Sequence, residues 1–349
     1  MLGFLLFLSS GLFLGWSLGA NDGATIFGTA VGSKMLKFKT AALTATAFVI
    51  IGAVFAGSGT SSTLNKLGTI NAVAGAFMVE LSAAITVYLM VRTKIITSTS
   101  QAIVGAIIGW NFYSLKATNY ALFSTIAATW VIGPVLASFF AICIYYILKS
   151  FVKKCKVSLL KQDAYIRIGL ILSGAFSAYA LGANNIANVM GVFIPSNLLQ
   201  PLPLPFGLSL SSTQVLFLIG AIAIGTGIFT YSQKNIDTIS RNITQISPFT
   251  AWIVIISQSL VLFIFASTSL HNFLLAHNLP TIPLVPVSSS QATIGAIMGI
   301  GLLKGGHCIN WRLISRMITG WIATPLISGI ICYISLFVIA NVFGLQVYK

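Results

Sequence analysis

One acidic residue, Asp22, stands in a stretch that is otherwise mostly apolar or small, "SLGANDGATIFGTAVGSK" at 17–34. An ionised carboxylate in an apolar membrane segment costs about 2.5–3.5 kcal/mol on insertion scales, so an acid retained there is a sign of function. Asn21 and Thr25 add further polar groups. Helix packing through interhelical hydrogen bonds would explain an isolated Asn or Thr, but it does not explain Asp22. We therefore interpret this motif as functional.

Two runs of hydroxyl residues, "TSTSQ" at 97–101 and "VSSSQ" at 287–291, each precede a Gly-rich apolar segment. Such a run suits the start of a half-helix, where free backbone N–H groups and the positive end of the helix dipole bind anions. Ordinary N-capping is the alternative, because Ser and Thr are preferred caps. The recurrence of the run, each time ending in Gln, favours an anion site.

Three motifs occur twice and in the same order along the chain. "GANDGATIFG" at 19–28 returns as "GANNIANVMG" at 182–191, and "STSQAIVGAIIG" at 98–109 returns as "SSSQATIGAIMG" at 288–299. "TWVIGPVLAS" at 129–138 returns as "GWIATPLISG" at 320–329, and we interpret this pair as a kink with an aromatic anchor. The repetition indicates a duplication, with halves at 1–148 and 164–349 joined by a basic linker at 149–163.

The composition is that of a polytopic membrane protein. Of 349 residues, 57% are hydrophobic and only 7% are charged, with a mean hydropathy of +0.97, whereas soluble domains are about 25% charged. The net charge of +15 does not indicate nucleic-acid binding, because the basic residues lie singly or in short clusters between apolar runs. That is the pattern of cytoplasmic loops.

Each half contains five apolar runs near or above the roughly 20 residues that cross a bilayer. They lie near 2–18, 40–57, 70–91, 95–115, 118–148, 164–182, 211–231, 248–270, 286–303 and 317–345. An odd number of crossings makes the second half enter from the opposite side, and such inverted repeats are typical of secondary transporters. A helix over 2–33 would be too long for one straight span, so we expect a broken helix or hairpin near the Gly-rich motif.

The basic residues predict the orientation. With the N-terminus outside, all of the 19 Lys and Arg residues except Lys66, Lys116 and Lys349 lie inside. The inside set is Lys34, Lys37, Lys39, Arg92, Lys94, the cluster at 149–161, Arg167, Lys234, Arg241, Lys304, Arg312 and Arg316. The positive-inside rule therefore places both termini outside and the linker in the cytoplasm, for a multi-pass protein of the cell (plasma or inner) membrane.

These motifs together resemble the inorganic phosphate transporter (PiT) family over nearly the whole chain. The resemblance rests on "GANDGATIFGTAVGSK", "STSQAIVGAIIG", "PVSSSQATIGAIMGIG", "INWRLISRMITGWIATPLISG" and "FTYSQKNIDTI". It implies a membrane symporter that imports phosphate with sodium or protons, holds its substrate between two inverted repeats and is often a homodimer. It implies no cofactor other than the coupling ion, and no enzymatic activity.

The motifs and the resemblance together give the candidate site residues. The substrate-binding set is Asp22, Ser98, Thr99, Ser100, Asn185, Ser288, Ser289 and Ser290. The cation-coupling set is Asn21, Asp22, Glu80, Gln101, Asn184 and Gln291, and all of these except Glu80 are candidate sodium ligands. Glu80 lies near the middle of an apolar run, which favours an intramembrane charge over a residue that reaches the surface from a helix end.

Two departures from the family pattern leave the coupling ion open. Asn185 stands where the family commonly has a second Asp, and Gln101 and Gln291 stand where many members have His. The negative charge is therefore on one side of the site.

The sequence fits three other functions less well. A sulfate permease on the same fold is the runner-up, but phosphate carries a proton that the Asp22 carboxylate can accept, whereas sulfate offers none near neutral pH. An anion channel fits a duplicated site with a buried acid less well than alternating access does. No Ser–His–Asp or metal-ligand constellation appears in the apolar runs to indicate an enzyme.

Overall fold

A computed structural model describes residues 2–93, 95–155, 158–196, 199–203, 205, 209–237, 247–306 and 309–348. Helices account for most of this part of the chain, and a short antiparallel hairpin of β1 (Leu202–Pro203) and β2 (Ser209–Leu210) adds two strands. The prediction of an α-helical polytopic membrane protein is confirmed. Four basic residues that entered the prediction of orientation lie outside the described residues: Lys94, Lys156, Arg241 and Lys349.

The two halves present their main helices in the same order. The first half consists of α1 (Leu2–Gly32), α2 (Phe38–Ala56), α3 (Ser58–Leu64), α4 (Val73–Arg92), α5 (Thr99–Ser114) and α6 (Tyr120–Cys155). The second half consists of α7 (Leu159–Met190), the 3-10 helix η1 (Gly191–Ser196), α8 (Ser212–Tyr231), α9 (Gln233–Asp237), α10 (Pro248–Ala266), α11 (Thr268–Ala276), α12 (Ser289–Leu303) and α13 (Trp311–Asn341). In both halves a long motif-bearing helix opens the order, and a long helix with an internal proline closes it.

Several helices of each half pack against helices of the other half. Helix α1 packs against α8, and its counterpart α7 packs against α2. Glycine makes the first of these contacts close: a Cβ on Gly19 would lie 1.9 Å from the carbonyl oxygen of Ile224, and one on Gly227 would lie 2.1 Å from that of Trp16. The same exchange places α5 on α13 and α12 on α6. Each half therefore completes the core of the other.

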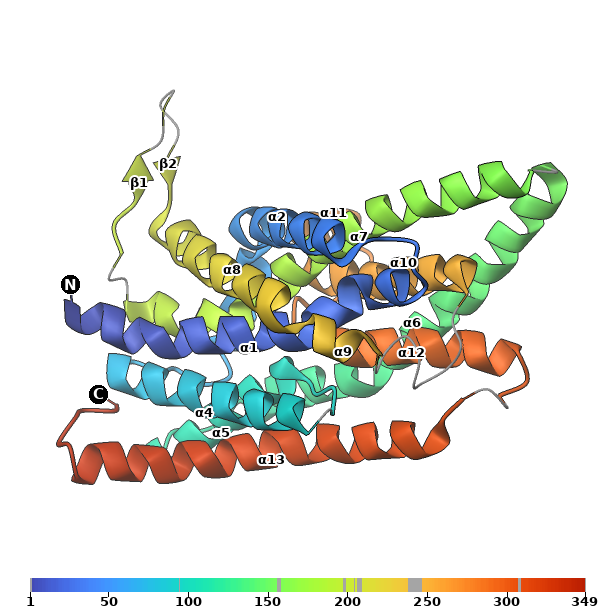
Figure 1. The fold of residues 1–349 in the computed structure, drawn as a ribbon. Helices are drawn as coiled ribbons and strands as arrows, with labels where there is room; N and C mark the ends of the chain where they lie inside the picture. The colour runs from blue at the N-terminus through green and yellow to red at the C-terminus, as the bar shows by residue number, and fades with distance from the viewer. Residues whose placement is uncertain are drawn as a thin grey trace.

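The chain ends lie where an odd number of crossings per half requires them. Both termini are at one end of the molecule, and the connection between α6 and α7 is at the opposite end (Figure 1). This arrangement is compatible with inverted repeats. Helix α6 continues to Cys155 and α7 begins at Leu159, so helix occupies most of the segment predicted as a linker. The boundaries at 148 and 164 stay a prediction.

The expected break near the Gly-rich motif is wrong. Helix α1 is continuous over 31 residues, and α7 is continuous over 32 residues through the matching motif. Residues 17–30 of α1 are buried by other helices. The polar groups of the motif therefore find partners in protein rather than lipid, so they do not require the helix to break.

Two of the ten predicted crossings are not formed by a single membrane-spanning helix. Helix α5 has 16 residues and α12 has 15, which is too short to cross the hydrocarbon. Both pack near the middle of a long helix: a Cβ on Gly105 would lie 2.1 Å from the carbonyl oxygen of Pro325, and one on Gly295 would lie 2.2 Å from that of Pro134. They are the half-helices that the hydroxyl runs predicted. Among the described residues, seven other helices are long and apolar enough to span a membrane.

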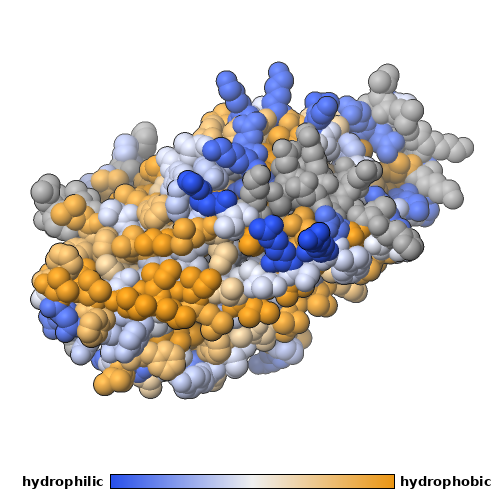
Figure 2. All heavy atoms as spheres, turned by 60° about the horizontal axis from the view of Figure 1, so that its bottom comes forward, coloured by the Kyte–Doolittle hydropathy of each residue, from blue (hydrophilic) through white to orange (hydrophobic). Residues whose placement is uncertain are grey.

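The surface agrees with a membrane location. Hydrophilic side chains gather toward one end of the face shown in Figure 2, and a broad hydrophobic area covers much of the rest. Arg167 donates to the carbonyl oxygen of Met35 at 3.0 Å, and Arg316 donates to that of Thr93 at 3.3 Å. These bonds bring two basic residues of the second half to segments of the first half that follow α1 and α4.

Candidate functional site

Asp22 lies where the two halves meet. Its side chain is 1% exposed. Asn21 Nδ2 donates to Asp22 Oδ1 at 2.7 Å, and Asn185 Nδ2 from α7 donates to Oδ2 at 3.3 Å. The hydroxyl of Ser289, in the first turn of α12, is a third hydrogen-bond partner. The sequence prediction placed these four residues in one site, and the structure brings them together.

The first Asn of each motif holds the extended segment before a half-helix. Asn21 Nδ2 donates to the carbonyl oxygen of Thr97 at 2.8 Å, and its Oδ1 accepts from the Thr97 N–H at 3.3 Å. In the second half, Asn184 Oδ1 accepts from the N–H of Val287 at 2.8 Å, and its Nδ2 donates to the carbonyl oxygen of Val285 at 3.3 Å. Both amides are thus engaged with backbone, which gives these two residues a positioning role.

Ser98 and Ser288 cap the two half-helices. The Ser98 hydroxyl accepts from the N–H of Gln101 at 3.2 Å, and the Ser288 hydroxyl accepts from the N–H of Gln291 at 3.3 Å. The capping alternative weighed for the hydroxyl runs is therefore confirmed for these two serines.

The third serines, Ser100 and Ser290, connect the two half-helices. Ser290 donates to the carbonyl oxygen of Thr97 at 2.8 Å, and Ser100 donates to that of Val287 at 3.3 Å. Each hydroxyl thereby reaches the residue just before the cap of the other half-helix. The two helix N-termini, with their positive dipole ends, converge on one place beside Asp22.

Several oxygen atoms around this place have no hydrogen-bond partner within the described part of the chain. They are Thr99 Oγ1, Gln101 Oε1, Asn185 Oδ1, Asn188 Oδ1 and Gln291 Oε1. All five residues are at most 3% exposed. Buried polar atoms in native proteins are almost always paired, so an unpaired group of this size requires an explanation such as a ligand or an ion.

Glu80 is buried apart from this network. It is 0% exposed, and neither carboxyl oxygen has a partner among the described residues. Gln258, its rough counterpart on α10, is fully engaged: its Nε2 donates to the carbonyl oxygen of Thr25 at 2.6 Å, and its Oε1 accepts from Thr293. The two halves therefore differ here in both charge and hydrogen bonding.

Among the described residues, no basic side chain forms an ion pair with Asp22. Within the described residues the one ion pair joins Arg167 to Asp163 at 3.3 Å, and both of those side chains are about half exposed. Asp22 is held by three neutral donors instead. An ionised carboxylate without a cationic partner is unfavourable in this apolar setting.

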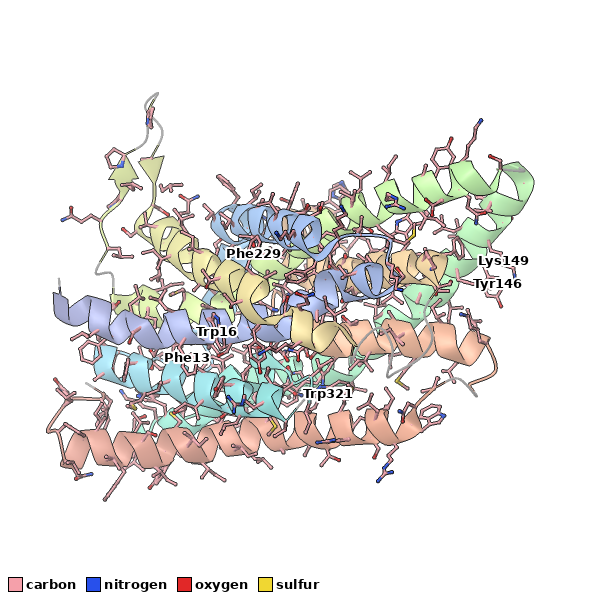
Figure 3. The ribbon with its side chains drawn as sticks, viewed as in Figure 1. Phe13, Trp16, Tyr146, Lys149, Phe229 and Trp321 are labelled. Carbon is pink, nitrogen blue, oxygen red and sulfur yellow. The ribbon has the colours of Figure 1, made fainter. Side chains whose placement is uncertain are left out.

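The repeated Trp–Pro motif has a role that the sequence reasoning did not assign. Trp321, on α13 (Figure 3), donates through Nε1 to the carbonyl oxygen of Ile96 at 3.2 Å. Thr324 shares a hydrogen bond of 2.6 Å with Thr97. These bonds hold the segment that leads into α5. The signal in the sequence was the order of the repeats, because each hydroxyl run, which begins a half-helix, is followed by one copy of the Trp–Pro motif.

Fold and site together define a polytopic helical membrane protein with an occluded polar site between two halves. The profile of the phosphate transporter family matches residues 18–332 of this chain. The chain belongs to that family.

Individual relatives agree with the family. The chain is 30% identical to "Putative phosphate permease MJ0630" of Methanocaldococcus jannaschii, and the match covers 91% of each chain. It is 27% identical to "Sulfate permease CysP" of Bacillus subtilis over 96% of this chain and 88% of that protein. A solved structure titled "The sodium-dependent phosphate transporter" has the same fold, with a TM-score of 0.75, 18% identity, and coverage of 97% of this chain and all of the other.

Proposed function

We propose that the protein is a secondary active transporter that imports inorganic phosphate together with sodium ions or protons. The substrate binds between the two halves, at the tips of α5 and α12. The location in the cell membrane with both termini outside belongs to this proposal, and assembly as a homodimer stays an expectation from the family resemblance.

The observation that carries the proposal is the position of Asp22. It is a buried acid that accepts hydrogen bonds from both halves and has no basic partner among the described residues. An anion cannot approach an unneutralised carboxylate without repulsion. A coupling cation removes that repulsion, so the arrangement supports obligatory co-binding of cation and anion.

The anion would be recognised by helix termini and hydroxyl groups. The two half-helix N-termini supply backbone N–H groups, and Thr99 supplies a hydroxyl without a partner in the described structure. Among the predicted substrate-binding residues, Ser98 and Ser288 act through the caps, and Ser100 and Ser290 through the contact between tips.

The cation would be bound by oxygen atoms. Unpaired oxygens of Gln101, Gln291 and Asn185 are available near the two tips, and hard cations prefer such ligands. Asn21 contributes by orienting Asp22. Glu80 would act as a second, separate acid in the coupling.

The burial of the site supports alternating access over a channel. Every predicted substrate-binding residue is at most 2% exposed. Access from either side therefore requires movement of the helices that enclose the tips, which is the behaviour of a carrier.

Sulfate is the second candidate, favoured by the 27% identity to the sulfate permease of Bacillus subtilis. Both anions are tetrahedral. Asp22 favours phosphate, because a protonated phosphate oxygen can donate to the carboxylate and sulfate cannot.

Competition in proteoliposomes tests the substrate. Uptake of labelled phosphate should fall with excess unlabelled phosphate and persist with excess sulfate. Saturable uptake of labelled sulfate that phosphate does not displace would assign the protein to sulfate instead.

A further inference from the structure

A cavity of about 810 Å³ lies between α5, α6 and α13, beside the candidate site but on its apolar side. Gly105 and Gly109 of α5 and Gly329 of α13 are among its lining residues, and aliphatic and aromatic side chains form most of its walls. Small-molecule sites typically have volumes of about 300–1,000 Å³, apolar walls and a few placed polar groups. This cavity has all three features.

The cavity is accessible from the surface that faces the bilayer. Leu326 and Ile330, which line it on α13, are 63% and 60% exposed, and Phe112 on α5 is 62% exposed. Helices α6 and α13 are both long and apolar enough to span a membrane. A molecule that enters the cavity from this surface therefore comes from the hydrocarbon phase rather than from water.

Two unpaired polar atoms belong to residues that line this apolar cavity. Gln101 Oε1, an acceptor, and Trp130 Nε1, a donor, have no hydrogen-bond partner within the described part of the chain. The Gln101 side chain is 3% exposed. The equivalent indole in the second half, that of Trp321, donates to a backbone carbonyl. The free indole N–H of Trp130 is therefore not a general property of this motif.

A bare alkyl chain would leave both of these atoms unpaired. A neutral carboxyl group carries an acceptor for the indole N–H and a donor for the amide oxygen. We propose that the cavity binds a long-chain fatty acid from the bilayer, with its carboxyl group protonated and hydrogen-bonded to Trp130 and Gln101. Its alkyl chain lies along the walls formed by α5 and α13.

The bound fatty acid would contact the anion site through α5. Gln101 lies one residue after Ser100, in the first turn of the half-helix. A ligand on Gln101 would hold that turn against α13 and would occupy the oxygen that the proposed function offers to the coupling cation, so it would slow phosphate uptake. This consequence rests on the proposed function, whereas the binding itself does not.

Binding is measured without transport, by photocrosslinking of the purified protein in nanodiscs with a radiolabelled fatty acid that carries a mid-chain diazirine. We expect saturable labelling on α5 and α13, which unlabelled palmitic acid displaces at least tenfold more effectively than its methyl ester. Leu326→Trp, which fills the cavity, should lower the labelling about tenfold. Ile318→Trp is the matched control, because Ile318 is an exposed residue of the same helix that does not line the cavity.

The polar contacts are tested separately. Gln101→Met should weaken palmitic acid to the level of the methyl ester and leave the ester unchanged, and Trp130→Phe should weaken both ligands severalfold. Uniform, non-saturable labelling of all lipid-facing helices would overturn the proposal. Crosslinks between two protein copies at Leu326 and Ile330 would overturn it as well, because a second copy would then cover the cavity. Saturable labelling in a protein that does not transport phosphate would leave this proposal standing and reject only the proposed function.

Discussion

Moving the acid across the site is the sharpest perturbation that the structure offers. Asp22 and Asn185 occupy matching positions in the two halves and are joined by a hydrogen bond of 3.3 Å. Three variants follow: Asp22→Asn removes the acid, Asn185→Asp adds a second one, and the double variant exchanges acid and amide. Asp and Asn are nearly isosteric, so the packing around the pair should survive in each variant.

The distance sets the size of the effect. Two carboxylates 3.3 Å apart repel each other by about 5 kcal/mol at an effective dielectric constant of 20. Asn185→Asp therefore requires an additional proton or sodium ion at the pair, and uptake should depend more steeply on the coupling cation. Asp22→Asn has no acid at the pair and should lose cation-driven accumulation. The double variant places the acid at position 185 and the amide at position 22, so one acid remains at the pair. It should recover much of the original cation dependence.

The assay is the initial rate of labelled phosphate uptake into proteoliposomes. The rate is measured against sodium concentration at fixed pH and then against pH at fixed sodium, for the native protein and all three variants. Full concentrative uptake by Asp22→Asn would refute the coupling role of Asp22. A double variant as inactive as Asp22→Asn would show that the two halves are not interchangeable at this position.

Other substitutions separate binding from stability. Thr99→Val removes a hydroxyl without a partner in the described structure, so phosphate binding should weaken about 10- to 150-fold, the equivalent of about 1.5–3 kcal/mol for a hydrogen bond to a charged group, at an unchanged melting temperature. Ser98→Ala removes the cap of α5 and should lower stability by about 0.5–2 kcal/mol. If Thr99→Val and Ser98→Ala change phosphate affinity and stability in the same way, the hydroxyl run serves only as a helix cap. Glu80→Gln should raise the melting temperature, because a buried amide costs less than an unpaired carboxylate, and it should change the sodium or pH dependence of uptake. An unaltered dependence would remove Glu80 from the coupling. Gly295→Ala would place a Cβ 2.2 Å from a backbone carbonyl of α6 and should cost about 1–3 kcal/mol in thermal unfolding. Gly191→Ala should be tolerated, because a Cβ there would lie 3.6 Å from its nearest neighbour. Equal losses of stability in Gly295→Ala and Gly191→Ala would argue against close packing as the cause.

Features that repeat along the chain could be predicted. The hydroxyl runs predicted half-helices starting near residues 98 and 288, and α5 and α12 begin at Thr99 and Ser289. Local chemistry is sufficient for this prediction. A Ser hydroxyl that accepts from the free backbone N–H three residues later caps the helix in either half. The isolated acid Asp22 was also sufficient to locate a buried polar cluster where the two halves meet.

Features that depend on contacts between halves could not be predicted. The exchange in which Ser290 reaches Thr97 and Ser100 reaches Val287 requires knowing that the two tips meet. The break expected in α1 was wrong for a related reason. Its length suggested a mismatch with the bilayer, but α8 and α4 cover the helix, and a helix buried in protein need not match the hydrocarbon thickness.

Accumulation of phosphate against an imposed potential tests the central claim most directly. The native protein is placed in proteoliposomes with an inside-negative potential of 100 mV, with an inward sodium or proton gradient, or with neither. A monovalent anion that only equilibrates would remain about 50-fold less concentrated inside, because each charge is worth about 2.3 kcal/mol at that potential. The account predicts that at least one cation gradient drives phosphate inside well above its outside concentration. Uptake that stops at the equilibrium ratio under every gradient would contradict it.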